Sequence, residues 1–246
     1  MARVRKTNCP FTLVEYRALL RLAKGRFPII GYPEHTRHPR FVIWRHDLDC
    51  SPEEMHRLAA LDAEEGVRAT LFIQLHSEFY HFWDARMMEL VKQWTAWGHA
   101  IGLHFDWGFH RQHLPQRLEE LIRQEATFLV RVYQTNISAF AYHNPDPTSL
   151  KHREHVAGLI NAYSKDLMGE ETVYVSDSNG RWRERTARDV LEDPKTTKAQ
   201  INTHDTWWTD ERIPQIEKLE KALRREAERR IDLYRSAAIV VVEDII

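Results

Sequence analysis

Stretches of mostly apolar residues alternate along this chain with stretches in which apolar residues recur every three or four positions. The first kind is typical of buried strands, and the second of helices with one buried face. The predicted strands are residues 41–49, 69–75, 100–106, 138–143, 173–176 and 199–203. The predicted helices are residues 13–24, 51–66, 84–97, 114–132 and 213–231. A β-branched run at 238–242 has the composition of a further strand with no evident place.

Local signals at the ends of the helices support this assignment. Ser51, Pro52 and Glu54 form a typical helix start, and Gly25, Gly66 and Gly98 are predicted to end helices. Strands that alternate with helices through short loops indicate parallel strands joined by right-handed crossovers. We therefore expect one α/β domain, with a helical N-terminal extension (1–40), a core (41–210) and a C-terminal helix and tail (211–246).

Composition excludes several classes of partner. The net charge of −1 gives no case for nucleic acid or an anionic membrane as the main partner, and no apolar run is long enough to span a bilayer. Only two cysteines are present, and charged residues interrupt the N-terminal segment where a signal peptide would be apolar. We expect a cytoplasmic protein; the oligomeric state is left open. No glycine-rich phosphate-binding loop follows any predicted strand.

Polar residues gather where the predicted strands end. The residues at these ends are Asp47 and Asp49, His104 and Asp106, His143 and Asn144, Asp177, and His204. The carboxyl ends of parallel strands in a barrel converge on one face, where sites are built. A lone aspartate often caps a helix and a lone strand histidine is often a core residue, but four strand ends carrying Asp or His favour a common site. His110 and His113 fall in a polar loop and are expected to be solvated; His76 is given no role.

Carboxylate oxygen and imidazole nitrogen are the ligands of Zn²⁺ and similar divalent ions. A catalytic metal keeps an open position for water, and a further Asp and His can then serve as general base and general acid. The strand ends therefore predict a metal-dependent hydrolytic site. Zn²⁺ is favoured as the cofactor, and Co²⁺, Ni²⁺ and Mn²⁺ are alternatives because N and O ligands suit several ions.

Six motifs, in this order, resemble the polysaccharide deacetylase (NodB-homology, carbohydrate esterase family 4-like) hydrolases. They are RHDLD, GVRATLFIQ, GHAIGLHFD, AYHNP, SDSNGRW and INTHDTWW, and they cover roughly residues 40–208. The resemblance implies an irregular (β/α)7 barrel and metal-dependent hydrolysis of a non-peptide carbon–nitrogen bond, such as the N-acyl bond of an amino sugar or glycan.

The resemblance also implies roles for individual residues. Asp47 would be the general base, His204 the general acid, and Asp49 and His104 metal ligands. The substrate-binding residues implied are Arg45, Asp106, Asn144, Asp177, Trp182 and Trp207, with Asp177 orienting a catalytic partner and the two tryptophans walling a sugar pocket.

This chain departs from the family pattern in its metal ligands. Gly108 stands where the family has a second histidine, so the third ligand is expected to be His143, with Asp106 as the other candidate. In addition, Leu48 separates the two aspartates, which are adjacent in the family. Two alternatives stay open: a metal-free barrel that binds carbohydrate without turnover, and a metal-dependent hydrolase of a non-sugar amide.

Overall fold

The computed structural model describes the backbone of residues 11–243 and the side chains of residues 11–237. Seven parallel strands form one sheet in the order β5-β4-β3-β2-β1-β7-β6. The strands are β1 (Phe41–Leu48), β2 (Thr70–Ile73), β3 (Ala100–Asp106), β4 (Ile137–His143), β5 (Ile160–Asn161), β6 (Thr172–Ser176) and β7 (Lys198–His204). The α-helices of this described part are α1 (Leu13–Arg26), α2 (Pro52–Glu64), α3 (Ala85–Ala96), α4 (Leu118–Tyr133), α5 (Ala187–Glu192) and α6 (Gln215–Glu243).

The sheet curls until its two edges approach each other. The ring of Tyr163, which follows β5, lies 6.1 Å from the ring of Tyr174 on β6. Gln200 of β7 also donates to the carbonyl of Ala162, at 2.9 Å. Within residues 11–243 no backbone ladder joins β5 to β6, so side chains close this side. Helices lie between β1 and β2, β2 and β3, β3 and β4, and β6 and β7. The expected irregular (β/α)7 barrel is confirmed.

Residues of β1 alternate between the helix layer and the barrel interior, and all of them are buried. Trp44 and His46 face outward: the Trp44 indole donates to Tyr16 of α1 at 2.9 Å, and His46 contacts Asp62 of α2 at 2.6 Å. Arg45 and Asp47 face inward and bond to each other. Because β1 is buried on both faces, its first residues form an unbroken apolar run in the sequence. The charged residues that end this run, Arg45 and Asp47, lie inside the barrel and not at a surface turn.

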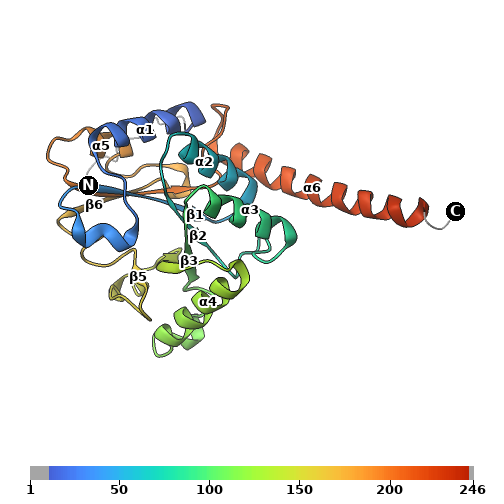
Figure 1. Cartoon of the computed structure of the whole chain (residues 1–246), viewed down its shortest axis with the longest axis horizontal. Helices are drawn as coiled ribbons and strands as arrows, with labels where there is room; N and C mark the ends of the chain where they lie inside the picture. The colour runs from blue at the N-terminus through green and yellow to red at the C-terminus, as the bar shows by residue number, and fades with distance from the viewer. Residues whose placement is uncertain (1–10, 244–246) are drawn as a thin grey trace.

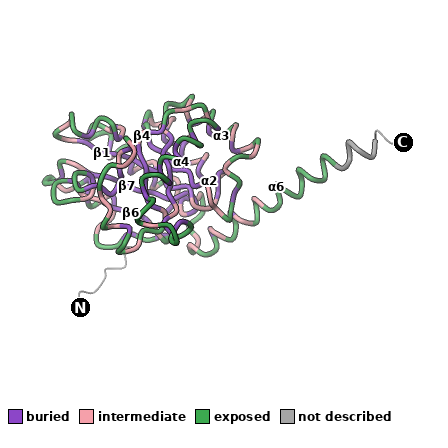
Figure 2. Tube along the Cα trace, turned by 90° about the horizontal axis from the view of Figure 1, so that it is seen from below, coloured by how far each residue is buried: buried purple, intermediate pink, exposed green. Residues whose placement is uncertain are grey.

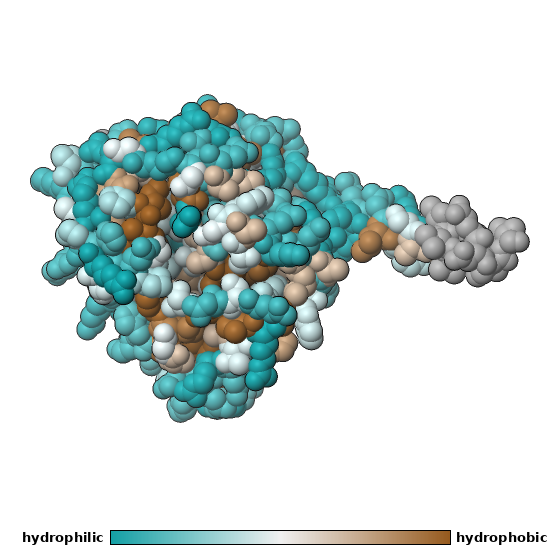
Figure 3. Space-filling view, viewed as in Figure 1, coloured by the Kyte–Doolittle hydropathy of each residue, from teal (hydrophilic) through white to brown (hydrophobic). Residues whose placement is uncertain are grey.

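The helices surround the sheet, except for the last one. In Figure 1, α1, α2 and α5 lie on one side of the sheet and α4 lies on the opposite side, while α6 extends away from the body. Figure 2 shows the buried residues concentrated in the body and mostly exposed residues along α6. In Figure 3, hydrophobic residues show in the recesses of the body, and a small hydrophobic patch lies on α6. None of the helices described in residues 11–243 has the length and apolar character needed to cross a bilayer.

Most predicted elements are confirmed, with boundary corrections that have local causes. Gly25 does not end the first helix, which continues to Arg26. The helix predicted from Leu114 begins only at Leu118, because the residue before Pro115 is extended. The run at 238–242 belongs to α6 and is not a strand, since no Gly or Pro interrupts the helix after Gln215. The very short β5 and α5 were not predicted.

Candidate active site

The acidic pair of the RHDLD motif lies at the carboxyl end of β1. Asp47 is the inward residue of the strand, and Asp49 follows two positions later, so both carboxylates face the same cavity. Parallel pairing places His204 of β7 directly beside Asp47. It also carries His104 of β3 and His143 of β4 to the same end of the barrel. The strand order thus converts residues distant in sequence into neighbours.

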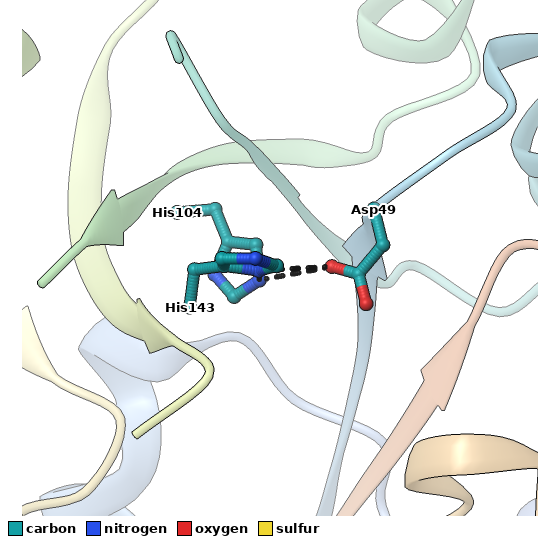
Figure 4. A group of neighbouring side chains, drawn as sticks. All are labelled: Asp49, His104 and His143. Atoms are coloured by element: carbon teal, nitrogen blue, oxygen red, sulfur yellow. Dashed lines mark hydrogen bonds and ion pairs between the residues drawn. The ribbon is translucent and has the colours of Figure 1, made fainter. Parts of the chain in front are cut away.

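Asp49, His104 and His143 form a triangle of ligand atoms (Figure 4). Asp49 Oδ1 lies 3.3 Å from His104 Nε2 and 3.4 Å from His143 Nδ1, and the two nitrogens are 3.3 Å apart. Around a tetrahedral Zn²⁺ with bonds of about 2.0–2.1 Å, neighbouring ligand atoms are about 3.3–3.4 Å apart. Asp49 Oδ1 is buried and has no hydrogen-bond partner among the described residues. The donor set and the spacing therefore fit a divalent cation, and an ion would satisfy the orphaned oxygen.

The Asp49 carboxyl is held in its ionised form. Burial alone would raise its pKa, but the imidazoles of His104 and His143 outweigh burial and hold the pKa well below its usual range. An ionised carboxylate is the form that binds a cation. The electrostatics of the triangle agree with its geometry.

Asp47 is held from one side only. Its Oδ2 accepts from Arg45 Nη2 at 2.7 Å and from Asn202 Nδ2 at 2.9 Å, while its buried Oδ1 has no hydrogen-bond partner within residues 11–237. Burial alone would raise the pKa of Asp47. The charge of Arg45, with smaller contributions from His104 and His204, outweighs burial, so the pKa of Asp47 lies below its usual value. Asp47 is thus a fixed, ionised carboxylate, with Oδ2 lying 3.8 Å from His104 Nε2 and 3.7 Å from His204 Nε2.

His204 is oriented by Asp177. Its Nδ1 lies 2.6 Å from Asp177 Oδ1, and Asp177 also accepts from the indole of Trp208 at 2.6 Å. This leaves His204 Nε2 3.7 Å from Asp47 and 4.0 Å from Asp49. Burial lowers the pKa of His204, but the hydrogen bond and charge of Asp177, followed by the charges of Asp49 and Asp47, outweigh burial and raise it to about 10. His204 therefore holds a proton at neutral pH.

A cavity of about 350 Å³ opens over these groups. This volume suits a small ligand or one unit of a longer one. Its walls are rich in aromatic and polar side chains, namely Tyr142, Tyr163, Tyr174, Trp207, Asn144, Ser176, Ser178, Asn179, Arg183 and Asn202. Aromatic faces with interspersed hydrogen-bonding groups suit a polyhydroxylated ring better than a purely apolar molecule.

The structure brings all five predicted catalytic and metal-binding residues to this cavity. These are Asp47, Asp49, His104, His143 and His204. Of the residues predicted to bind substrate, Asn144 and Trp207 line it as well. Their roles in binding or catalysis stay predictions.

Four residues predicted to touch substrate do not line the cavity. Arg45 and Asp177 are fully buried behind Asp47 and His204, so each acts through its neighbour. Asp106, the last residue of β3, accepts from Gln74 Nε2 and from the backbone N–H of Phe109, and it is not part of the Asp49–His104–His143 triangle. Trp182 stacks on Phe11 in the core, at 5.9 Å between ring centroids.

Sequence reasoning missed several cavity residues. Arg183 lines the cavity where Trp182 was expected, because neighbours in an extended segment point to opposite sides. Asn202 could have been found by its position, since it precedes His204 by two residues and therefore shares its face. Tyr163 follows a two-residue strand that has no hydrophobic period, and no sequence signal marks it.

No family model and no curated protein sequence matches this chain. Among solved structures, a family 4 carbohydrate esterase from Streptococcus mutans is 14% identical, with 84% of this chain and 90% of that chain covered and a TM-score of 0.48. A family 4 carbohydrate esterase from Bacillus anthracis is 14% identical, with coverage of 92% and 94% and a TM-score of 0.43. The chitin deacetylase of Colletotrichum lindemuthianum is 15% identical, with coverage of 76% and 83% and a TM-score of 0.42.

Proposed function

We propose that this chain is a divalent-metal-dependent hydrolase that removes the acyl group from the nitrogen of an acylated amino sugar. The observation that carries the proposal is the ligand triangle of Asp49, His104 and His143, with Asp47 and His204 next to each other beside it. The order of the sequence motifs supports the same reaction.

The three ligand residues would hold the cation, with Zn²⁺ favoured by the His₂Asp donor set. When bound, such an ion lowers the pKa of a water molecule and polarises a carbonyl. Asp47 would take up the proton of the attacking water, because its carboxylate is held ionised by Arg45 beside the ligand triangle. His204 would deliver its Nε2 proton to the departing amine, since Asp177 holds Nδ1.

This assignment of roles follows from the two electrostatic environments. Arg45 beside Asp47 favours the ionised, proton-accepting form of that carboxyl. Asp177 beside His204 favours the charged, proton-donating form of the imidazole. Two titratable groups whose surroundings push them into opposite protonation states are the arrangement that acid–base catalysis requires.

The test is acetate release from N-acetylglucosamine oligomers by chain loaded with Zn²⁺ or Co²⁺. Loss of a general acid typically costs about 10²–10⁴ in rate, so His204→Asn is expected to lower kcat/KM by that range. The matched control is His81→Ala, an exposed histidine outside the cavity, which should retain full activity. Equal activity in His204→Asn and His81→Ala would contradict the role of His204 as general acid.

The substrate and the reaction are tested separately. A metal-loaded chain that is inactive on acetylated sugars but cleaves a formamide or a cyclic amide would move the assignment to a non-sugar hydrolase. A chain that binds sugar oligomers but releases no acyl group would be a binding barrel. The cytoplasmic location expected from the sequence stays a prediction.

A further inference from the structure

A second cluster of ligand-type side chains lies outside the cavity. It consists of His76 in the loop after β2, His110 in the loop after β3, and Glu125 on α4, and we refer to it as the His76–His110–Glu125 cluster. None of the three lines the cavity that holds Asp49. The expectation that His110 is solvated is wrong: it is buried, because α4 packs over the loop and supplies Glu125 as its partner.

Both imidazoles point at one carboxylate oxygen. His76 Nε2 lies 2.8 Å from Glu125 Oε1, and His110 Nε2 contacts the same oxygen. The ligand atoms of the three residues all lie within 4.8 Å of one another. Three separate segments of the chain thus converge on one point with two nitrogens and a carboxylate.

The other oxygen of Glu125 is left without a partner. Glu125 is only 7% exposed, and its Oε2 is buried with no hydrogen bond from any described residue. A buried carboxylate oxygen without a donor is costly. The two histidines contact only Oε1, whereas a cation chelated by both oxygens of Glu125 would also satisfy Oε2.

The two rings are held in place by aromatic neighbours. Phe109 stacks on His76 with ring centroids 3.6 Å apart and planes 6° apart. Phe105 stacks on His110 at 5.1 Å and 11°. The side chain of His76 is 24% exposed, which leaves a path from solvent to the cluster. Fixed imidazoles beside an accessible edge are the features of a site that binds a metal without large rearrangement.

We propose that the His76–His110–Glu125 cluster binds a second divalent cation of the zinc type. The His₂Glu donor set is one that Zn²⁺ uses, and to reach tetrahedral spacing the ligand atoms must open by about 0.5 Å between His76 and Glu125 and by more between His110 and Glu125.

The second cation would stabilise the loops that support the first site. The loop between β3 and α4 begins two residues after His104, and Asp106 at the end of β3 accepts from Gln74 after β2. A cation at the cluster joins these same two loops to α4. It therefore fixes the segment that follows a ligand strand of the first site, without touching the cavity itself.

The experiment isolates the second site by removing the first. In an Asp49→Ala/His104→Ala double variant, we expect about one equivalent of Zn²⁺ per chain, by mass spectrometry of metals. We also expect a tetrahedral absorption band in the visible when Co²⁺ replaces Zn²⁺. Adding Glu125→Gln should remove both. Zn²⁺ at hundredfold excess over its Kd should raise the Tm of the double variant by roughly 5–10 °C.

Matched variants separate a lost ligand from a damaged fold. His113→Ala changes an exposed histidine of the same loop and should leave the metal content of the double variant unchanged. If Glu125→Gln does not fold, His76→Asn alters the part-exposed ligand and should lose the metal as well. The inference is overturned if the double variant takes up no Zn²⁺ or Co²⁺, or if Glu125→Gln and His76→Asn retain as much as His113→Ala does. Neither outcome depends on activity at the first site.

Discussion

Replacing Asp177 by asparagine isolates the interaction that keeps His204 protonated. Asp177 is fully buried and supplies the two largest contributions that raise the pKa of His204 from 6.5 to about 10. At about 1.4 kcal/mol per pH unit, the difference of about 3.5 pH units corresponds to about 5 kcal/mol of preference for the charged imidazole. A single opposite charge at hydrogen-bond distance accounts for about 1–3 pH units of such a difference.

Asp177→Asn should therefore lower the pKa of His204 by about 1–3 units. A cation bound by Asp49 offsets the charge of Asp49 but not that of Asp177, so the direction holds with metal bound. A histidine with a raised pKa stabilises the fold fully at pH values below its unfolded pKa of 6.5, and loses that contribution as pH rises through about 10. In Asp177→Asn this loss should be smaller and should be complete at a lower pH.

The assay has two readouts. Nuclear magnetic resonance of the His204 ring gives its pKa directly, and the basic limb of the kcat/KM profile should move to lower pH by the same amount. Asp205→Asn is the matched control, because Asp205 is the adjacent buried carboxylate but bonds to the backbone amides of Asp49, Cys50 and Ser51. An unchanged ring pKa in Asp177→Asn, or an equal fall in Asp205→Asn, would refute the reasoning.

Two further predictions concern stability around the site. Arg45→Met leaves the buried Asp47 unpaired, which should lower the free energy of unfolding by about 3–5 kcal/mol in urea titration; a loss below about 1 kcal/mol would contradict the pairing. Gly102→Ala places a methyl group 2.5 Å from two ring carbons of Phe72 and should cost about 1–3 kcal/mol. Phe72→Leu in the same chain should restore part of that loss, and an unchanged Tm in Gly102→Ala would show that the packing is looser than described.

Much of the barrel could be predicted from the sequence because its strands are buried on both faces and its helices carry one apolar face. The strand predicted at 100–106 matches β3 residue for residue, and Ser51 caps α2 by accepting from the Glu54 amide, as its motif indicates. The two-residue β5 could not be predicted, because two residues cannot show a period and its pairing depends on β4. The β-branched run at 238–242 was misassigned because local strand preference did not outweigh the continuing helix.

In the site, too, some residues could be predicted from the sequence and others could not. Asp47, Asp49, His104, His143 and His204 could be predicted because each stands at the end of a recognisable strand. The partners of these residues could not. Whether Arg45 points at Asp47 or at substrate depends on the curl of the sheet, and whether His110 is solvated depends on how α4 packs, which brings Glu125 to it. Contacts of this kind depend on how the sheet curls and the helices pack, so they cannot be predicted from residue spacing in the sequence.

The measurement that tests the central claim most directly is the metal content of the purified chain beside Asp49→Ala, His104→Ala and His143→Ala. Each variant should hold about one equivalent less Zn²⁺ than the parent, or bind it far more weakly, whatever the His76–His110–Glu125 cluster retains. A parent that contains no metal and takes up none from Zn²⁺, Co²⁺ or Ni²⁺ would contradict the account, as would three variants that hold as much as the parent. The chain would then be a barrel that binds its ligand without hydrolysing it.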